Sequence, residues 1–156
     1  MSNKVYLSQQ QFDHMVIELA NKVNKARKFF TVYGIERGGI YISKPISKYI
    51  LADHRSIKIS FYSDKDTVNS EPICNFYDTD FEHLKSLPYP ILLVDDTLDS
   101  AITLNYFINK TNMIQGKHFY FACLYYNKNN KYGLVPDFWV NEKKENDWIV
   151  FPHEIA

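Results

Sequence analysis

The sequence predicts an α/β fold in three layers, with a twisted, mostly parallel sheet flanked by helices. Two short apolar runs predict buried strands: one lies within residues 29–39, FFTVYGIERGG, and the other is residues 91–94, ILLV. Each run ends abruptly at a charged or glycine-rich turn, a pattern typical of parallel strands covered on both faces. A third run, FYFACLYY at residues 119–126, follows a helical stretch and continues the alternation of strand and helix.

The segments around these strands carry the periodicities of helices and further strands. Ser8 and Gln11 have the spacing of a capping box, and residues 12–23 repeat apolar side chains at helical spacing. After Gly39 a second helix is expected, running through Ile50 with Pro45 in its first turn. Residues 56–62 and 73–77 predict strands on either side of a polar stretch at residues 63–70.

Length and composition predict one domain that spans residues 1–156, with enough apolar side chains for a single core. The 18 basic and 18 acidic residues balance, which argues against nonspecific nucleic-acid binding through bulk charge. Cys74 and Cys123 lack metal-ligand spacing and are expected to be reduced thiols. No stretch has the length of a membrane span and the N-terminus lacks a signal-peptide core, so we expect a cytoplasmic protein with no membrane partner.

Three carboxylates follow the strand at residues 91–94, at Asp95, Asp96 and Asp99. Crowding three negative charges is unfavourable unless a cation or polyol hydroxyls share the site, and Mg²⁺ prefers carboxylates together with substrate phosphate oxygens. The next residues are expected to open a helix whose free N–H groups lie beside the hydroxyls of Ser100 and Thr103, an arrangement suited to a phosphate. The alternative is an ordinary strand end whose aspartates cap the helix.

A second polar turn, Arg37-Gly38-Gly39, follows the apolar run that begins at residue 29. Adjacent glycines let the backbone approach a ligand closely, and the arginine supplies a permanent cation. On its own this turn has a purely structural alternative, but two such motifs in the same order and separation are more specific than either one.

These two motifs resemble those of the type I phosphoribosyltransferases. The segment from Asp95 resembles the family's phosphoribosyl pyrophosphate signature, with Ala101 where the family usually has glycine, and residues 34–39 resemble its pyrophosphate loop. The resemblance implies the family's three-layer fold and a phosphoribosyl pyrophosphate site. That expected site comprises Arg37, Gly38, Gly39, Asp95, Asp96, Thr97, Leu98, Asp99, Ser100, Ala101, Ile102 and Thr103.

The resemblance also implies a role for each part of this site. Asp95 and Asp96 would hold Mg²⁺ and the ribose hydroxyls, and residues 100–103 would bind the 5′-phosphate. Arg37 and its two glycines would bind the leaving pyrophosphate, and Asp99 would act as the catalytic residue beside the purine imidazole ring. By position, residues 63–70 resemble the family's loop that closes over the reacting centre.

Ala101 departs from the family pattern inside the phosphate site. If the backbone there needs a positive φ, alanine costs on the order of 1 kcal/mol, whereas at a helical φ it is harmless. A weakened or non-catalytic relative is therefore a second interpretation of the chain.

The C-terminal segment resembles the small base-recognition segment of xanthine-guanine and other 6-oxopurine phosphoribosyltransferases. Trp148 would stack on the base, the Ile149 backbone would read its edge and Glu154 stands at the family's acidic position, while His153 replaces a usual tryptophan. The alternative is that this segment only completes the core as an edge strand.

The base-reading lysine of the family has no counterpart directly after the apolar run at residues 119–126. The sequence there gives Asn127 and Lys128, so the lysine is displaced by one residue or absent, and the Asn127 amide could bind a carbonyl or an amino group instead. The resemblance therefore specifies the phosphoribosyl chemistry more closely than it specifies the base.

Taken together, the sequence predicts a magnesium-dependent transferase that uses phosphoribosyl pyrophosphate and a nucleobase, most similar to 6-oxopurine enzymes of purine salvage. A homodimer is expected from the resemblance, and no nucleic-acid partner. Two alternatives stay open: a non-catalytic protein that senses phosphoribosyl pyrophosphate or a nucleotide, and a related reaction such as transfer to another base or nucleotide cleavage.

Overall fold

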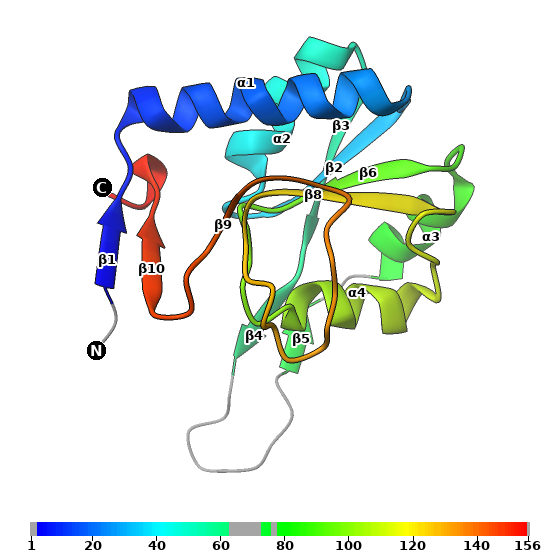
Figure 1. Cartoon of the computed structure of the whole chain (residues 1–156). Coiled ribbons are helices and arrows are strands. Elements are labelled where there is room, and N and C mark those ends of the chain that lie inside the picture. Colours follow the sequence, from blue (N-terminus) through cyan, green and yellow to red (C-terminus); the bar gives the residue numbers. More distant parts are fainter. Residues whose placement is uncertain (1–2, 63–72, 76–77, 156) are drawn as a thin grey trace.

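The computed structural model describes residues 3–62, 73–75 and 78–155 (Figure 1). The polar stretch at residues 63–70 and the end of the strand expected at 73–77 lie outside these ranges. The helices are α1 (Gln9–Ala26), α2 (Ile40–Ile50), α3 (Asp78–Ser86), α4 (Ile102–Thr111) and the short 3₁₀ turn η1 (Pro152–Glu154). The strands are β1 (Asn3–Tyr6), β2 (Thr31–Glu36), β3 (Asp53–Lys58), β4 (Ser60–Tyr62), β5 (Ile73–Asn75), β6 (Ile91–Val94), β7 (Thr97–Leu98), β8 (Phe119–Tyr126), β9 (Phe138–Glu142) and β10 (Asp147–Val150).

The main sheet is parallel throughout and confirms the predicted fold class. Its strand order is β3-β2-β6-β8-β7, and β9 pairs with the other edge of β8. All four residues of β6 are buried, as expected for a strand covered on both faces. In the β2–β6 register Gly34 lies opposite Val94, so these two strands end side by side.

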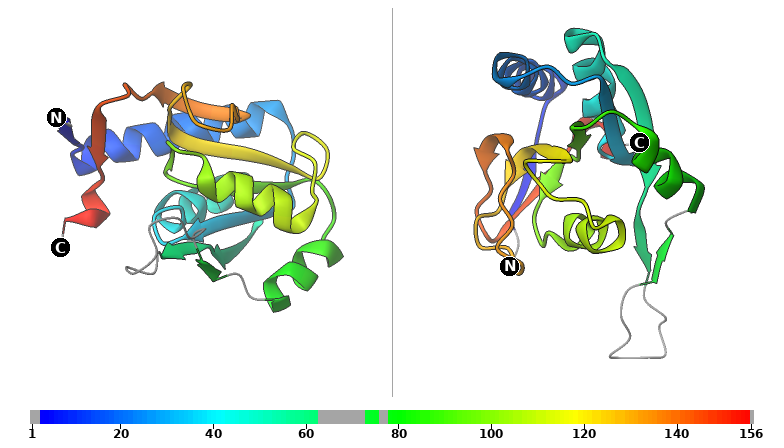
Figure 2. Two further views of the ribbon diagram at one scale, coloured as in Figure 1. Left: turned by 90° about the horizontal axis from the view of Figure 1, so that it is seen from below. Right: turned by 90° about the vertical axis from the view of Figure 1, so that its right-hand side faces the viewer.

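Helices cover both faces of this sheet (Figure 2). On one face α1 and α2 pack against alternate strand residues, including Val32, Leu92 and Leu124. On the other face Leu84 of α3 and Phe107 of α4 join a second cluster that includes the other faces of β6 and β8. The molecule therefore has the three layers that the alternating sequence pattern predicts.

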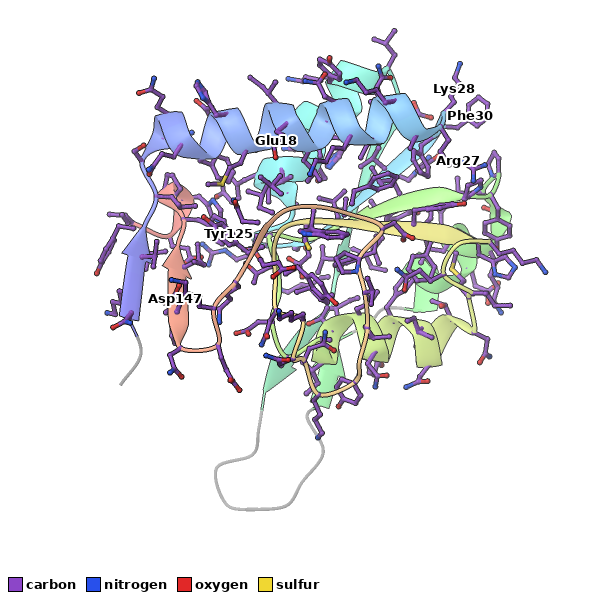
Figure 3. All side chains as sticks on the ribbon, in the orientation of Figure 1. Glu18, Arg27, Lys28, Phe30, Tyr125 and Asp147 are labelled. Carbon is purple, nitrogen blue, oxygen red and sulfur yellow. The ribbon has the colours of Figure 1, made fainter. Side chains whose placement is uncertain are left out.

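Helix α1 begins as its sequence predicts. The Ser8 hydroxyl accepts a hydrogen bond from the Gln11 N–H at 3.1 Å, and the Gln11 side chain accepts one from the Ser8 N–H at 2.9 Å. At the other end Arg27 donates a hydrogen bond to the Tyr120 hydroxyl and lies 4.9 Å from that ring's centroid, which ties the end of α1 to β8 (Figure 3).

Several local expectations were wrong in detail. Helix α2 begins at Ile40, so Pro45 is an interior residue rather than part of the first turn. Residues 56–62 divide between two strands, because β3 belongs to the main sheet whereas β4 forms a separate antiparallel pair with β5. Helix α4 begins only at Ile102, because β7 first adds a two-residue pairing with β8.

The chain termini meet in a small parallel pair beside the main sheet (Figure 1). Strand β1 pairs with β10, which places Lys4 opposite Trp148 and Val5 opposite Ile149. Ile149 and Phe151 are buried in the first core cluster, whereas the Trp148 side chain is 59% exposed. The tail thus completes the core with one face and presents Trp148 on the other. Among the described residues, none of the helices combines the length and hydropathy needed to cross a membrane.

Candidate active site

The two predicted loops lie together at the carboxyl ends of β2 and β6, where open α/β sheets bind ligands. A Cβ atom built on Gly38 would lie only 2.1 Å from Oδ2 of Asp96. Gly39 lies close to the backbone at the end of β6, since a Cβ there would lie 2.5 Å from the Val94 carbonyl oxygen. Both glycines are therefore required for this contact between the loops. A cis peptide bond joins Glu36 to Arg37 at the start of the first loop.

The adjacent carboxylates of Asp95 and Asp96 are electrostatically costly where they lie. Burial raises the pKa of Asp95 well above its usual value, and the neighbouring charge of Asp96 raises it further. Burial likewise raises the pKa of Asp96. The Asp95 carboxylate accepts a hydrogen bond from the Asp96 N–H at 2.8 Å. A divalent cation would relieve the repulsion between the two groups, so this pair of oxygen ligands fits Mg²⁺.

The predicted phosphate site is a small hollow of about 90 Å³ between β6 and α4. It is lined by Asp95, the continuous segment Thr97–Leu104 and Phe121. Ala101 stands immediately before α4 with φ 65° and ψ 15°, a left-handed conformation that favours glycine. The alanine departure is therefore the costly case of the two considered from the sequence.

A second hollow, about 210 Å³ in volume, separates the acidic loop from the C-terminal tail. Its lining brings together predicted residues from both ends of the site, with one acidic residue, Asp147, and one lysine, Lys143, that were not singled out beforehand. The lining residues are Asp96, Thr97, Asp99, Lys143, Asp147, Trp148, Ile149, Phe151 and Glu154. A flat apolar wall with a few convergent polar groups is the usual character of a site for a small aromatic ligand.

Asp99 is held from two sides at the edge of this hollow. The Asn127 amide donates a hydrogen bond to its Oδ1 at 3.0 Å, and Lys143 Nζ lies 3.3 Å from the same oxygen. The side chain of Lys143 is only 5% exposed, and its ammonium also donates to the backbone carbonyls of Lys144 and Glu145. These contacts hold the Lys143 ammonium at the lining of the hollow.

Lys128, the displaced lysine considered from the sequence, has different surroundings. It is exposed and pairs with Glu142 at 3.9 Å, and it does not contribute to the hollow of 210 Å³. Sequence reasoning missed Lys143 because its position depends on the turn between β9 and β10. The available signal was the charged run NEKKEN at residues 141–146, directly before DWIV at residues 147–150. No local pattern showed that this turn folds back onto Asp99.

A third hollow, about 590 Å³ in volume, lies on the other side of the Arg37 loop. It is lined by Glu36, Arg37, Ile40, Tyr41, Lys44, Pro45 and Lys58. Three of these side chains are cationic and one is anionic, so the hollow suits a ligand with several negative charges. Lys44 and Lys58 are further basic residues that the sequence analysis did not assign to the site.

Comparison with known proteins agrees with this geometry. The model of the phosphoribosyl transferase domain family matches residues 2–156. The search of curated proteins gave no significant match.

Three solved structures illustrate the similarity of fold. A purine phosphoribosyltransferase from Pyrococcus horikoshii is 26% identical, with a TM-score of 0.73, and the match covers 98% of this chain and 95% of that one. A xanthine-guanine-hypoxanthine phosphoribosyltransferase from Helicobacter pylori is 19% identical, with a TM-score of 0.71 and the same coverage. A hypothetical protein from Neisseria gonorrhoeae with bound ppGpp is 18% identical, with a TM-score of 0.77, and the match covers 100% of this chain and 92% of that one.

The family match extends over nearly the whole chain and includes both loops at the strand ends. The chain therefore belongs to the phosphoribosyl transferase domain family.

Proposed function

We propose that this protein transfers the 5-phosphoribosyl group from phosphoribosyl pyrophosphate to a 6-oxopurine, in a magnesium-dependent reaction that releases pyrophosphate. The observation that carries the proposal is the position of the Asp95–Asp96 pair between three hollows of different chemistry. Asp95 lines the phosphate hollow and Asp96 lines the hollow beside Trp148. Gly38, the residue after Arg37 of the cationic hollow, lies close to Asp96. A 5′-phosphate, a ribose with its base, and a pyrophosphate need such an arrangement.

The basic groups support a 6-oxopurine as the acceptor. The Lys143 ammonium has three N–H donors and no acceptor, and these donors contact Asp99 and the backbone carbonyls of Lys144 and Glu145. A base that replaced the 3.5 Å contact with the Glu145 carbonyl would need a carbonyl oxygen, rather than only an amino group, at its ring edge. Exposed Trp148 supplies an aromatic face for the base, and Ile149 gives an apolar wall beside it. Guanine, xanthine and hypoxanthine share the carbonyl and the planar double ring, whereas adenine lacks the carbonyl.

In the proposed reaction the bond between the anomeric carbon and the pyrophosphate oxygen breaks, and a bond forms to a purine nitrogen. Positive charge develops on the ribose ring, so the protein contributes mainly by positioning the reactants and stabilising separated charge. Asp99 would accept the proton that leaves the purine imidazole ring, with Asn127 and Lys143 holding its carboxylate in place. Arg37, Lys44 and Lys58 would stabilise the departing pyrophosphate.

Asp95 and Asp96 would hold Mg²⁺ together with ribose and pyrophosphate oxygens. When bound, the ion would neutralise charge that develops on the leaving pyrophosphate. The raised pKa values of both carboxyl groups support this role, because a cation bound between the two acids would favour their ionised forms.

A second candidate function is ligand sensing without catalysis. Ala101, in a left-handed conformation within the phosphate hollow, is the observation that favours it. A protein of this fold has been crystallised with ppGpp bound, so the fold also holds a nucleotide with two pyrophosphate groups. The cytoplasmic location stays a prediction from the sequence. The family resemblance adds a homodimer to the proposal, and light scattering of the purified chain would test it.

Incubation with Mg²⁺, phosphoribosyl pyrophosphate and one base at a time tests the function, with mass spectrometry of the products. The panel comprises guanine, hypoxanthine, xanthine, adenine, uracil and orotate. We expect nucleotide from at least one 6-oxopurine, with at least a hundredfold slower formation (about 3 kcal/mol) in Asp99→Asn. The matched control is Asp13→Asn, an exposed acid on α1 that should keep the rate of the unaltered protein.

Three outcomes would contradict parts of the proposal. Product from uracil or orotate alone would overturn the purine assignment, and ribose 5-phosphate released from a nucleotide would indicate cleavage instead. A thermal shift with phosphoribosyl pyrophosphate but no product from any base would favour the sensor.

A further inference from the structure

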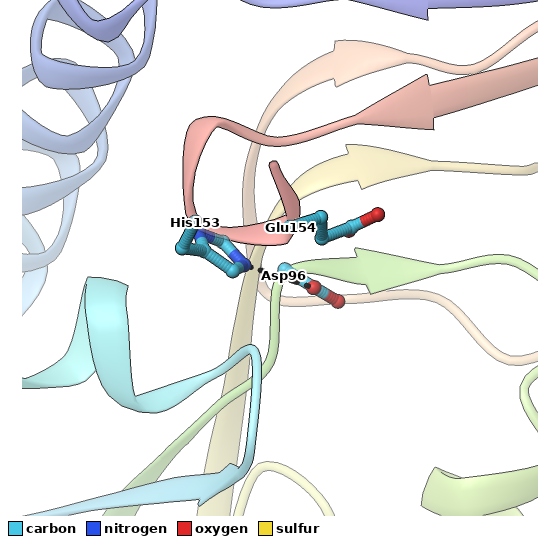
Figure 4. A group of neighbouring side chains, drawn as sticks. All are labelled: Asp96, His153 and Glu154. Carbon is cyan, nitrogen blue, oxygen red and sulfur yellow. Dashed lines mark ion pairs between the residues drawn. The ribbon is translucent and has the colours of Figure 1, made fainter. Parts of the chain in front are cut away.

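A histidine in an unusual environment lies at the end of β6, next to the acidic loop (Figure 4). His153 of η1 stacks on the Tyr41 ring at a centroid distance of 4.1 Å and an interplanar angle of 5°. Phe151 stacks on it at 5.4 Å, and Phe12 meets it edge-on at 5.7 Å. Its side chain is only 10% exposed. The aromatic rings around it hold the imidazole in one orientation.

Among the residues that the structure describes, neither ring nitrogen of His153 has a hydrogen-bond partner, although both nitrogens are buried. Leaving a buried polar atom without a partner costs about 1–3 kcal/mol, and a phenylalanine would fill the same slot at no such cost. The aromatic rings thus surround an imidazole whose Nε2 atom is available to a ligand.

The Nε2 atom of His153 faces the carboxylate of Asp96 at 4.0 Å from Oδ2 (Figure 4). This separation is too long for a hydrogen bond, which requires about 3 Å between the heavy atoms. It is about 0.6 Å longer than the separation of about 3.4 Å between a nitrogen and an oxygen ligand of a tetrahedral ion whose bonds are each about 2.0–2.2 Å long, so a small movement of either side chain would let one ion bind both. The carboxylate of Glu154, the next residue along η1, brings a third donor, and the three donor atoms lie within 4.8 Å of one another.

We propose that Asp96, His153 and Glu154 bind a divalent transition-metal ion of the Zn²⁺ class. To bind one ion, the three donor atoms would have to move only slightly closer together, because the exposed Glu154 side chain is free to turn toward Asp96 and His153. The imidazole decides the class of metal, since nitrogen ligands suit Zn²⁺, Ni²⁺ and Cu²⁺ whereas Mg²⁺ prefers oxygen alone. The Nε2 atom would gain a partner that the described part of the chain does not give it.

This site differs from the Asp95–Asp96 pair expected to hold Mg²⁺, because it shares only Asp96 with that pair. An ion here would join η1 to the end of β6 and so fix one wall of the hollow that Trp148 and Glu154 line. The inference does not depend on the proposed transfer reaction, since its readout is metal affinity.

Isothermal titration of the purified full chain with Zn²⁺, with Mg²⁺ as the comparison metal, tests the proposal. We expect one Zn²⁺ per chain, and removal of one ligand should weaken binding at least about tenfold, since even outer-shell changes have effects of that size. The variants are His153→Phe, which keeps the aromatic stack, and Glu154→Gln, which alters only an exposed side chain. The matched control is His14→Ala, which removes a histidine of α1 outside the site and should leave the affinity unchanged.

Titration with Co²⁺ identifies the ligand atoms. We expect visible ligand-field bands without a sulfur-to-cobalt charge-transfer band, because the proposed donors are one nitrogen and two carboxylate oxygens. Equal Zn²⁺ affinity in the unaltered protein and in both His153→Phe and Glu154→Gln would overturn the proposal, as would a sulfur band that disappears in Cys74→Ser. Mg²⁺ binding that weakens in His153→Phe as much as Zn²⁺ binding would overturn the assigned metal class.

Discussion

Lys143 and Asp99 form an ion pair at 3.3 Å between the turn after β9 and the acidic loop after β6. The lysine side chain is 5% exposed whereas the Asp99 side chain is 55% exposed, so the cation is confined while the carboxylate stays accessible. This pair brings a donor-only group and an acid to the same rim of the hollow that Trp148 lines. A purine in that hollow would have its carbonyl edge near the Lys143 ammonium and its imidazole edge near the Asp99 carboxylate.

Lys143→Met should weaken binding of the base. A hydrogen bond that involves a charged group contributes about 1.5–3 kcal/mol, so the KM for a 6-oxopurine should rise about 10- to 150-fold. The KM for phosphoribosyl pyrophosphate should change little, because Lys143 does not line the phosphate hollow. Steady-state kinetics with each substrate varied in turn measure both constants.

The matched control for this substitution is Lys128→Met, which removes an exposed lysine from the neighbouring β8–β9 region. We expect its kinetic constants to stay within about twofold of the unaltered protein, because exposed ion pairs contribute little. Equal effects of the two substitutions would show that Lys143 does not read the base.

Ala101→Gly should stabilise the protein. Ala101 has φ 65°, and a left-handed conformation costs a residue with a Cβ on the order of 1 kcal/mol relative to glycine. The free energy of unfolding in urea should rise by about that amount. The opposite change is expected in Ala20→Gly within α1, where the helix loses about 1 kcal/mol, so the two variants separate backbone strain from a general effect of glycine. No gain in Ala101→Gly would mean that the backbone strain at residue 101 is smaller than its φ indicates.

Local patterns were sufficient to predict much of the fold. The capping box of α1 and the apolar runs of β6 and β8 depend on neighbours in sequence, and the structure confirms all three. The meeting of the Arg37 loop with Asp96 was also predictable, because parallel strands bring their carboxyl ends to one edge of the sheet.

The features that sequence reasoning missed depend on contacts between distant segments. Strand β7 has only two residues, too few for a periodic signal, and exists through its pairing with β8. Lys143 lies near Asp99 because its backbone N–H donates to the Tyr126 carbonyl at the end of β8, a contact between distant segments that no local pattern showed. The stack of His153 on Tyr41 likewise joins η1 to α2.

The pH dependence of stability should change in Asp95→Asn. The folded-state pKa of Asp95 is raised by burial and by the charge of Asp96, above the ordinary value of 3.8. The unfolded chain therefore releases this proton first. The contribution of Asp95 to stability is fully present below that ordinary value and is lost as the pH rises through the raised folded-state value. In the absence of divalent ions, Asp95→Asn should melt at a higher temperature than the unaltered protein at neutral pH, with a smaller decrease above the ordinary aspartate range.

Thermal melts across a pH series check this expectation, with Asp13→Asn as a control that should follow the unaltered protein. The same Asp95→Asn variant should lose the stabilisation that Mg²⁺ and phosphoribosyl pyrophosphate give together. A lower melting temperature at neutral pH would show that the Asp95 carboxylate stabilises the fold despite its burial.

The two glycines of the Arg37 loop should respond differently to alanine. At Gly38 the added Cβ would lie 2.1 Å from Oδ2 of Asp96, a side-chain atom that can rotate away. At Gly39 it would lie 2.5 Å from the Val94 carbonyl oxygen and 2.6 Å from that of Ile35, both in the backbone of the central strands. Gly38→Ala should therefore disturb the site, and Gly39→Ala the fold.

We expect the free energy of unfolding of Gly38→Ala to stay within about 1 kcal/mol of that of the unaltered protein, because only a side chain has to move. The same variant should bind phosphoribosyl pyrophosphate with Mg²⁺ at least about tenfold more weakly. Gly39→Ala should lose at least about 2 kcal/mol of stability, since the backbone of packed strands cannot yield. Urea unfolding and calorimetric titration measure the two effects. Gly133→Ala is the control: its φ is +63° with open space around the added Cβ, so it should cost about 1 kcal/mol through backbone strain and leave binding intact. If Gly38→Ala bound the ligand normally, the close approach of this loop to Asp96 would have no role in the site.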